Sequence, residues 1–205
     1  MKKLIVILFV VFIGGQQAIA QNSHGLKNDY IVKCENKNIL IADNIGNSFG
    51  QESLEFNLIV NYQLSLQQMI ADGKYDWYSE DFTEEHFPQV KKTGNDTIKC
   101  RLFYVADIIQ GNTEGGKGIQ KRINEKMDKE GYRAATLAEL LALGINYPEL
   151  QLKFIIFAEG SIWKDIDGLV HGVPFLCSVY KDRHLRLDYQ GLSLNENYAY
   201  LGVKK

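Results

Sequence analysis

Residues 54–62 read LEFNLIVNY, and this stretch decides the fold class. Apolar side chains recur at every second position and share one face: Leu54, Phe56, Leu58, Val60 and Tyr62. Alternation of this length is typical of a β-strand that packs on one side only. The sequence therefore predicts a sheet with a buried face, beginning at this strand.

Two helices with capping signals lie downstream of this strand. Residues 65–68, Ser-Leu-Gln-Gln, place a serine three residues before a glutamine, and Gly73 is expected to end this helix in the left-handed conformation. Residues 136–139, Thr-Leu-Ala-Glu, form a second capping box before a helix over 137–143 that is expected to end at Gly144. The Thr136 hydroxyl is expected to accept from the backbone N–H of Glu139, so that Thr136→Ala lowers stability by about 1 kcal/mol.

The remaining patterns complete the fold prediction. Ile119, Ile123 and Met127 recur every four residues among charges and predict a helix with a narrow apolar stripe, ending at Gly131. Strands are expected over 97–105, 154–157, 170–180, 183–189 and 198–203. Because strands and helices do not alternate regularly, the sequence predicts an α+β fold with a mainly antiparallel sheet, three or four short helices and a β-rich C-terminal half.

The first 20 residues have the three parts of a secretion signal. Lys2 and Lys3 precede an apolar run over 4–13, and a small-x-small site stands at 18–20. We expect cleavage after Ala20 and export to the periplasm or beyond the cell. Residues 21–50 are interpreted as a loosely ordered polar segment with one candidate strand over 38–42, and residues 51–205 as a single domain. No later stretch is apolar for long enough to predict an integral membrane segment after signal cleavage.

Charge and cysteine content narrow the choice of partners. Signal cleavage would leave 21 basic residues (23 less Lys2 and Lys3) against 25 acidic ones, which speaks against nucleic acid as a partner. Cysteine occurs at Cys34, Cys100 and Cys177 without a Cys-x-x-Cys spacing, so no zinc knuckle is predicted. An exported chain could form one disulfide and the sequence leaves this open, but we favour Cys100 and Cys177 as reduced, buried apolar residues.

The glycine-rich stretch 111–118, GNTEGGKG, matches seven of the eight positions of a phosphate-binding loop. The eighth position needs Ser or Thr to ligate magnesium, and here it is Gly118. We interpret the stretch as a flexible connection that is dispensable for ligand binding. No nucleotide or other cofactor is predicted.

Patterns for nucleophilic and metal catalysis are also incomplete. Ser161 follows Gly160 but lacks the Gly-x-Ser-x-Gly context, and the four histidines form no close pair. Glu84-Glu85-His86 could bind a metal or act in acid–base chemistry, but a solvated turn is the favoured interpretation and no metal site is predicted. An enzyme is not favoured, and a hydrolase whose carboxylates meet only in the fold is the alternative.

Residues 75–82, YDWYSEDF, combine aromatic and acidic side chains in an unusual density. Exposed aromatic rings could stack on a sugar or fill a pocket of a partner protein, with carboxylates fixing the orientation. The candidate binding residues are Tyr75, Asp76, Trp77, Tyr78 and, in a separate stretch, Trp163. We favour the alternative that Trp77 and Phe82 fill the core beneath a long loop.

Four stretches together resemble a family of uncharacterised bacterial proteins: 69–77 (MIADGKYDW), 87–88 (FP), 132–142 (YRAATLAELLA) and 195–203 (NENYAYLGV). The resemblance covers residues 54–205 and implies no activity or catalytic residue. The helix start at 133–139 is also similar to the Arg-Leu-Pro-Thr-x-x-Glu start in formylglycine-generating-enzyme-like and C-type-lectin-like domains, although the Leu and the Pro are missing. The sequence as a whole predicts an exported binding or interaction module with an unknown protein or carbohydrate ligand.

Overall fold

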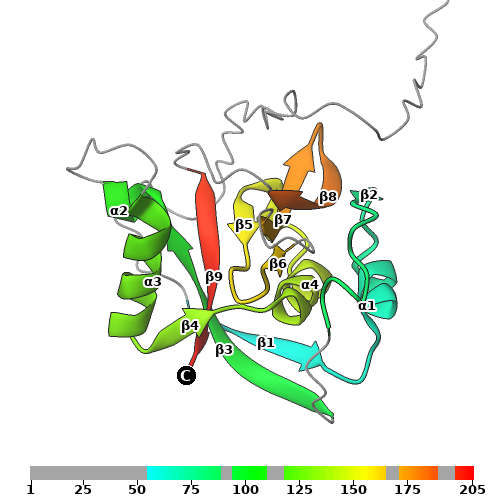
Figure 1. Cartoon of the computed structure of the whole chain (residues 1–205), viewed down its shortest axis with the longest axis horizontal. Helices are drawn as coiled ribbons and strands as arrows, with labels where there is room; N and C mark the ends of the chain where they lie inside the picture. The colour runs from blue at the N-terminus through cyan, green and yellow to red at the C-terminus, as the bar shows by residue number, and fades with distance from the viewer. Residues whose placement is uncertain (1–54, 89–93, 110–117, 165–170, 189–196) are drawn as a thin grey trace, which may run out of the picture. The chain divides into compact units, whose positions relative to one another are not determined.

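A computed structural model describes residues 55–88, 94–109, 118–164, 171–188 and 197–205 (Figure 1). The elements in chain order are β1 (Glu55–Asn61), α1 (Leu66–Gly73), β2 (Trp77–Tyr78), β3 (Asn95–Tyr104), α2 (Ala106–Ile109), α3 (Ile119–Lys129), β4 (Tyr132–Ala134), α4 (Leu137–Asn146), the 3₁₀ helix η2 (Leu150–Leu152), β5 (Ile155–Phe157), β6 (Trp163–Lys164), β7 (His171–Val179), β8 (Asp182–Asp188) and β9 (Tyr198–Lys204). No helix within these ranges is long and apolar enough to cross a membrane. The predicted signal peptide, the segment 21–50 and residues 111–117 of the glycine stretch lie outside the described residues.

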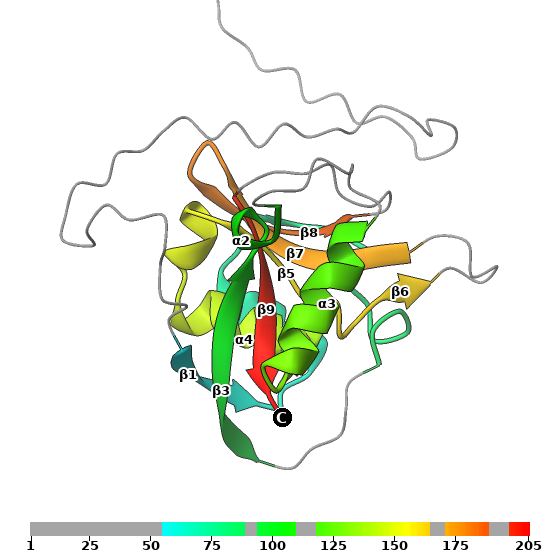
Figure 2. The same ribbon diagram turned by 90° about the vertical axis from the view of Figure 1, so that its left-hand side faces the viewer.

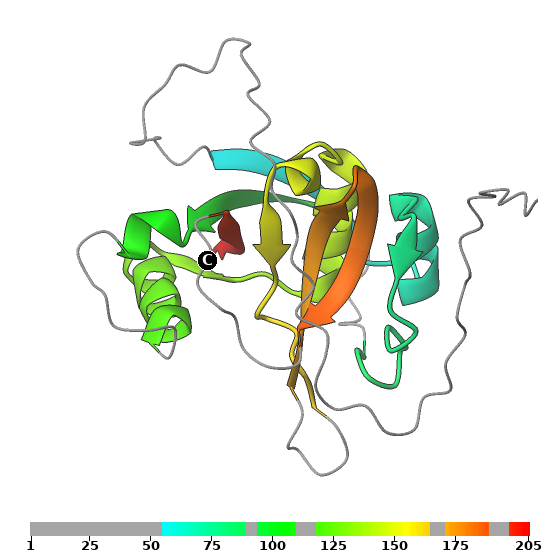
Figure 3. The same cartoon turned by 90° about the horizontal axis from the view of Figure 1, so that it is seen from above.

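The strands pair in the order β1-β3-β9-β5-β7-β8-β2, and β4 and β6 pair with β9 and β7. β5 runs parallel to β9 and β2 runs parallel to β8, whereas the other pairs are antiparallel. Figure 3 shows β5, β7 and β8 side by side. The sheet is therefore mixed and mostly antiparallel, and the fold is α+β, as the sequence predicts. The short strands β2, β4 and β6 were not predicted, because two or three residues carry no readable alternation.

Successive side chains of a strand point to opposite faces of the sheet, and each face packs in a core of its own. Ala199 and Leu201 of β9 pack in the core that contains α1 and α4, whereas Tyr200 packs with α3 in the other. Figures 1 and 2 show α3 and α4 on opposite sides of β9. The apolar stripe of α3 is fully used in this second core, since Ile123 and Met127 are at most 1% exposed. The predicted amphipathic helix is confirmed.

The two described cysteines lie on opposite faces of the sheet. Cys100 of β3 belongs to the core with α4, and Cys177 of β7 belongs to the core with α3, so the sheet separates them. Both are fully buried, as predicted, and burial raises the pKa of the Cys100 thiol to about 12. Cys34 lies outside the described residues.

The glycines expected to end α1 and α4 have a different role. Lys74, not Gly73, adopts the left-handed conformation after α1 (φ 49°), and α4 continues past Gly144. A Cβ atom on Gly73 would lie 2.3 Å from the Tyr75 ring, and one on Gly144 would lie 2.1 Å from the Tyr75 hydroxyl oxygen. α1 thus ends at Gly73 as predicted, although the left-handed residue is Lys74, whereas the predicted end of α4 at Gly144 was wrong. The lack of a side chain at both glycines makes room for Tyr75.

Arg183 on β8 ties both helices to the sheet. Its guanidinium donates to the carbonyl of Gly73 (2.7 Å), to the carbonyl of Gly144 (2.6 Å) and to the side-chain oxygen of Gln151 (3.0 and 3.2 Å). The two carbonyls lie in the last turns of α1 and α4, where the helix dipoles are negative. Among the described residues, the Arg183 guanidinium thus donates to helix carbonyls and an amide oxygen, and the two helix ends help to compensate its charge.

Candidate functional site

The aromatic stretch forms the edge of the sheet. Trp77 and Tyr78 make up β2, which pairs with β8 as the last strand in the sheet order, and they are 43% and 44% exposed. Successive side chains of a strand point to opposite faces, so these two residues lie on either side of the edge. The favoured core position of Trp77 is thus wrong, because an edge strand has a neighbour on one side only. Phe82 is buried at 1% exposure, as expected.

Two polar side chains of β8, Arg186 and His184, lie beside the Trp77 ring. The Arg186 guanidinium carbon lies 4.8 Å from the ring centroid, and the His184 ring lies 5.7 Å away. Burial, followed by the charge of Arg186, lowers the pKa of His184, which favours the neutral imidazole. Asp76 fixes the start of β2, because it accepts from the Arg183 backbone N–H at 2.7 Å. We call Trp77, Tyr78 and Arg186 the aromatic edge.

The other two aromatic candidates are positioned differently. Tyr75 packs against the core and lies 5.2 Å from the Arg183 guanidinium, which gives it a structural position between helices and sheet. Trp163 lies in β6, packs partly against the same core, and has its ring 4.6 Å from the ring of His86. Neither residue is part of the aromatic edge.

The acidic turn at Glu84-Glu85-His86 fits the favoured solvated interpretation. Glu84 and Glu85 are exposed, and the His86 Nδ1 lies 2.9 Å from the backbone oxygen of Asp81. Within the described residues, no group of three or more His, Cys, Asp or Glu side chains is arranged to hold a metal.

A cavity of ≈410 Å³ at the start of α4 is the second candidate site, and we call it the α4 pocket. It is lined by Tyr62, Phe87, Pro88, Arg133, Ala134, Thr136, Leu137, Ala138, Glu139, Gly160 and Ser161. Its volume is in the range of small-molecule sites, and its wall combines apolar side chains with a few polar ones. No catalytic motif in the sequence indicated this pocket.

A buried ion pair forms one wall of the α4 pocket. Glu139 is 1% exposed and accepts two hydrogen bonds from Arg133 (2.6 and 2.9 Å), one from the Tyr62 hydroxyl (2.9 Å) and one from the Thr136 backbone N–H (2.7 Å). Burial opposes ionisation of Glu139, but these donors outweigh it and hold the pKa below its usual value. The carboxylate is saturated, so it holds Arg133 in place and has no oxygen left for proton transfer.

The predicted capping box at Thr136 is present, but its two halves are unequal. The Glu139 carboxylate reaches back to the Thr136 N–H, and the backbone has capping-box geometry. The Glu139 N–H faces the Thr136 hydroxyl oxygen in return, but without the geometry of a regular hydrogen bond, so this buried oxygen has no well-formed hydrogen bond among the described residues. The Leu137 N–H is capped instead by the Ser161 hydroxyl, at 2.9 Å. The α4 N-terminus thus uses a serine from a distant loop.

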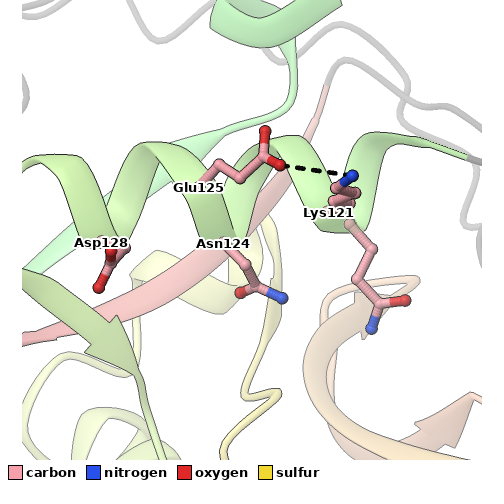
Figure 4. A pocket seen from close by; sticks show the side chains of 5 residues that line it. Lys121, Asn124, Glu125 and Asp128 are labelled. Carbon is pink, nitrogen blue, oxygen red and sulfur yellow. Dashed lines mark ion pairs between the residues drawn. The ribbon is translucent and has the colours of Figure 1, made fainter.

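A wider groove of ≈530 Å³ runs along α3 and is lined by Gln120, Lys121, Asn124, Glu125 and Asp128 (Figure 4). All five belong to one helix, and Lys121 and Glu125 form an exposed ion pair at 3.7 Å. This is the solvated face of an amphipathic helix and offers no enclosed site.

Glu159 is the described residue closest to the chemistry of the hydrolase alternative. Burial raises its pKa to about 7, against opposing hydrogen bonds from Asn124 and Gln120. A hydrolase of that kind needs two neighbouring carboxylates. The side chains that contact Glu159 through these bonds are amides, and the Asn124 contact measures 3.0 Å.

Two separate stretches of the sequence meet at the α4 pocket, since Phe87 and Pro88 line the same cavity as the helix start over 133–139. Comparisons with protein-family models, with curated proteins and with solved structures found no match for the chain. Both candidate sites therefore rest on geometry.

Proposed function

We propose that the chain is an exported binding module, with one α+β domain over residues 51–205, and that its partner is a protein that contacts the aromatic edge. The observation that supports this proposal is the exposure of Trp77 and Tyr78, at 43% and 44%, beside the Arg186 guanidinium. Trp, Tyr and Arg are the residue types most enriched among the energetic hot spots of protein interfaces.

The placement of the two rings favours a protein over a carbohydrate. A sugar stacks on one flat aromatic face, whereas Trp77 and Tyr78 project from opposite sides of a strand. Arg186 lies 4.8 Å from the Trp77 ring centroid, so one ring face is partly covered by a cation. A protein surface can contact both sides of such an edge.

Partner capture followed by titration tests the proposal. The chain would be used to capture and identify a partner, and the dissociation constant would then be measured with the purified partner. Trp77→Ala and Tyr78→Ala should each weaken binding by about 30-fold, the effect of a 2 kcal/mol hot spot. Tyr180→Ala is the matched control, because Tyr180 is 87% exposed in the turn between β7 and β8 and should leave binding unchanged.

Two outcomes would contradict the proposed partner or its location. Equal affinity of the wild-type chain and both variants would show that the aromatic edge is not the contact. Trp77-dependent binding to a glycan array, without a protein partner, would assign the edge to a carbohydrate instead.

Export has its own test. The support is the pattern of Lys2 and Lys3, the apolar run over 4–13 and the small residues at 18–20. N-terminal sequencing of chain recovered outside the cytoplasm should begin at Gln21. Retention of the intact chain in the cytoplasm would contradict export.

A further inference from the structure

The α4 pocket has unused hydrogen-bond donors. Arg133 has five N–H donors, and its contacts with Glu139 and with the Ala134 carbonyl occupy three of them. The remaining two, one on Nη2 and one on Nε, have no partner within the described ranges. The Arg133 side chain is 39% exposed and lines the α4 pocket, while the buried Glu139 carboxylate fixes its guanidinium.

The hydroxyl groups of the pocket add to this donor excess. The Ser161 oxygen accepts from the Leu137 N–H, which leaves its own hydrogen available. The buried Thr136 oxygen has no hydrogen-bond partner in the described part of the chain. A buried polar atom without a partner is costly, and a ligand atom in the pocket would remove that cost.

Charge decides which acceptor fits these donors. Arg133 and Glu139 cancel one another, so the remaining positive character comes from the N-terminus of α4 and from the neutral hydroxyls. This environment suits one negative charge better than the two of a phosphate. A cation has no partner here, because Glu139 already accepts four hydrogen bonds.

Apolar side chains complete the wall beside the donors. Phe87, Pro88, Leu137 and Ala138 line the same cavity, and its ≈410 Å³ accommodates a small molecule. We propose that the α4 pocket binds a small organic carboxylate with an apolar body, the carboxylate lying against Arg133, Thr136 and Ser161. This site is separate from the aromatic edge and does not depend on the proposed protein partner.

Titration by nuclear magnetic resonance tests the proposal with defined probes. Hexanoate, benzoate and 3-phenylpropanoate would be added separately to the full-length chain, with benzamide as the neutral counterpart of benzoate. At least one carboxylate should shift the backbone amide signals of residues 136–139 and 161 in a saturable way. Benzamide should bind at least tenfold more weakly, because a hydrogen bond to a charged group is worth about 1.5–3 kcal/mol.

Variants of the pocket and a matched control complete the experiment. Thr136→Val keeps the branched shape and removes the hydroxyl, and it should weaken carboxylate binding by about tenfold or more. Thr136→Ser restores the hydroxyl and should restore binding, which separates ligand contact from misfolding. Thr97→Val, at an exposed position of β3, and Trp77→Ala should both leave binding unchanged. The proposal is overturned if no carboxylate gives a saturable shift, if benzamide binds equally well, or if Thr136→Val binds like the wild-type chain.

Discussion

Two arginines at opposite ends of α4 show how the same side chain serves different purposes. Arg183 lies at the C-terminal end, where two helix carbonyls and the buried Gln151 side chain use its donors. Arg133 lies at the N-terminal end, where Glu139 uses part of its donors and where the side chain lines a cavity. The first arginine is surrounded by structural partners, and the second has donors to spare.

The difference separates a structural cation from a candidate ligand-binding one. Arg183 uses four of its five N–H donors on structural partners, which adds rigidity. Arg133 uses three, and its spare donors lie on a side chain that lines a cavity beside an unpartnered hydroxyl, which indicates room for a ligand. Arg183 therefore should affect stability alone. Arg133 and its neighbours should affect both stability and binding, and the following predictions test this division.

Arg183→Met should have the largest effect. The substitution leaves the carbonyls of Gly73 and Gly144 and the Gln151 oxygen without their donors, and each such loss costs about 1–3 kcal/mol. We expect the free energy of unfolding to fall by about 3–5 kcal/mol, measured by urea denaturation. Arg186→Met on the same strand is the control and should cost about 1 kcal/mol at most, the value of its contact with the Trp77 ring. Similar losses in both variants would contradict the structural role of Arg183.

Glu139→Gln should have the next largest effect. An amide at this position turns one hydrogen-bond acceptor into a donor, which then faces the Arg133 and Thr136 donors. Because Arg133 is 39% exposed and can be rehydrated, we expect a loss of about 2–3 kcal/mol, near the lower limit for breaking a buried pair. Thermal or urea unfolding would measure it. A loss below that of a single cap, about 1 kcal/mol, would show that the pair is not essential.

These contacts also show which parts of the structure can be predicted from the sequence. The longer strands, the α3 stripe and the Ser65 cap follow from local patterns, and the structure confirms them. The Tyr62 hydroxyl, by contrast, reaches Glu139 across 77 residues of sequence, and Arg183 reaches Gly73 across 110. No spacing rule predicts such pairs, because topology alone brings them together. Sequence alone does not predict the α4 pocket for this reason, although Phe87-Pro88 and the helix start at 133–139 both stand out in it.

Acid should distinguish the two arginines. Interactions in the fold lower the pKa of Glu139 below its value of 4.5 in the unfolded chain, so the stability it contributes is present above pH 4.5 and is lost as pH falls through the folded-state pKa. The cost of Glu139→Gln should therefore shrink at low pH. The partners of the Arg183 guanidinium are carbonyl and amide oxygens, so the cost of Arg183→Met should show no such titration. Urea unfolding of both variants between pH 3 and pH 7 would measure this, and parallel pH profiles would contradict it.

Thr136→Ala should have the smallest effect on stability. The sequence predicts the loss of a helix cap, about 1 kcal/mol, but the Thr136 hydroxyl makes no hydrogen bond with the described residues. We therefore expect a change within about 0.5 kcal/mol, because the substitution removes an unsatisfied polar atom and little else. Ser65→Ala is the matched control: the Ser65 hydroxyl accepts from the Gln68 N–H at 3.2 Å, and its loss should cost about 1 kcal/mol. If the two variants lose equal stability in parallel urea titrations, the Thr136 hydroxyl is an ordinary cap. The α4 pocket would then lose its unpartnered group, and the contrast between the two ends of α4 would rest on the spare Arg133 donors alone.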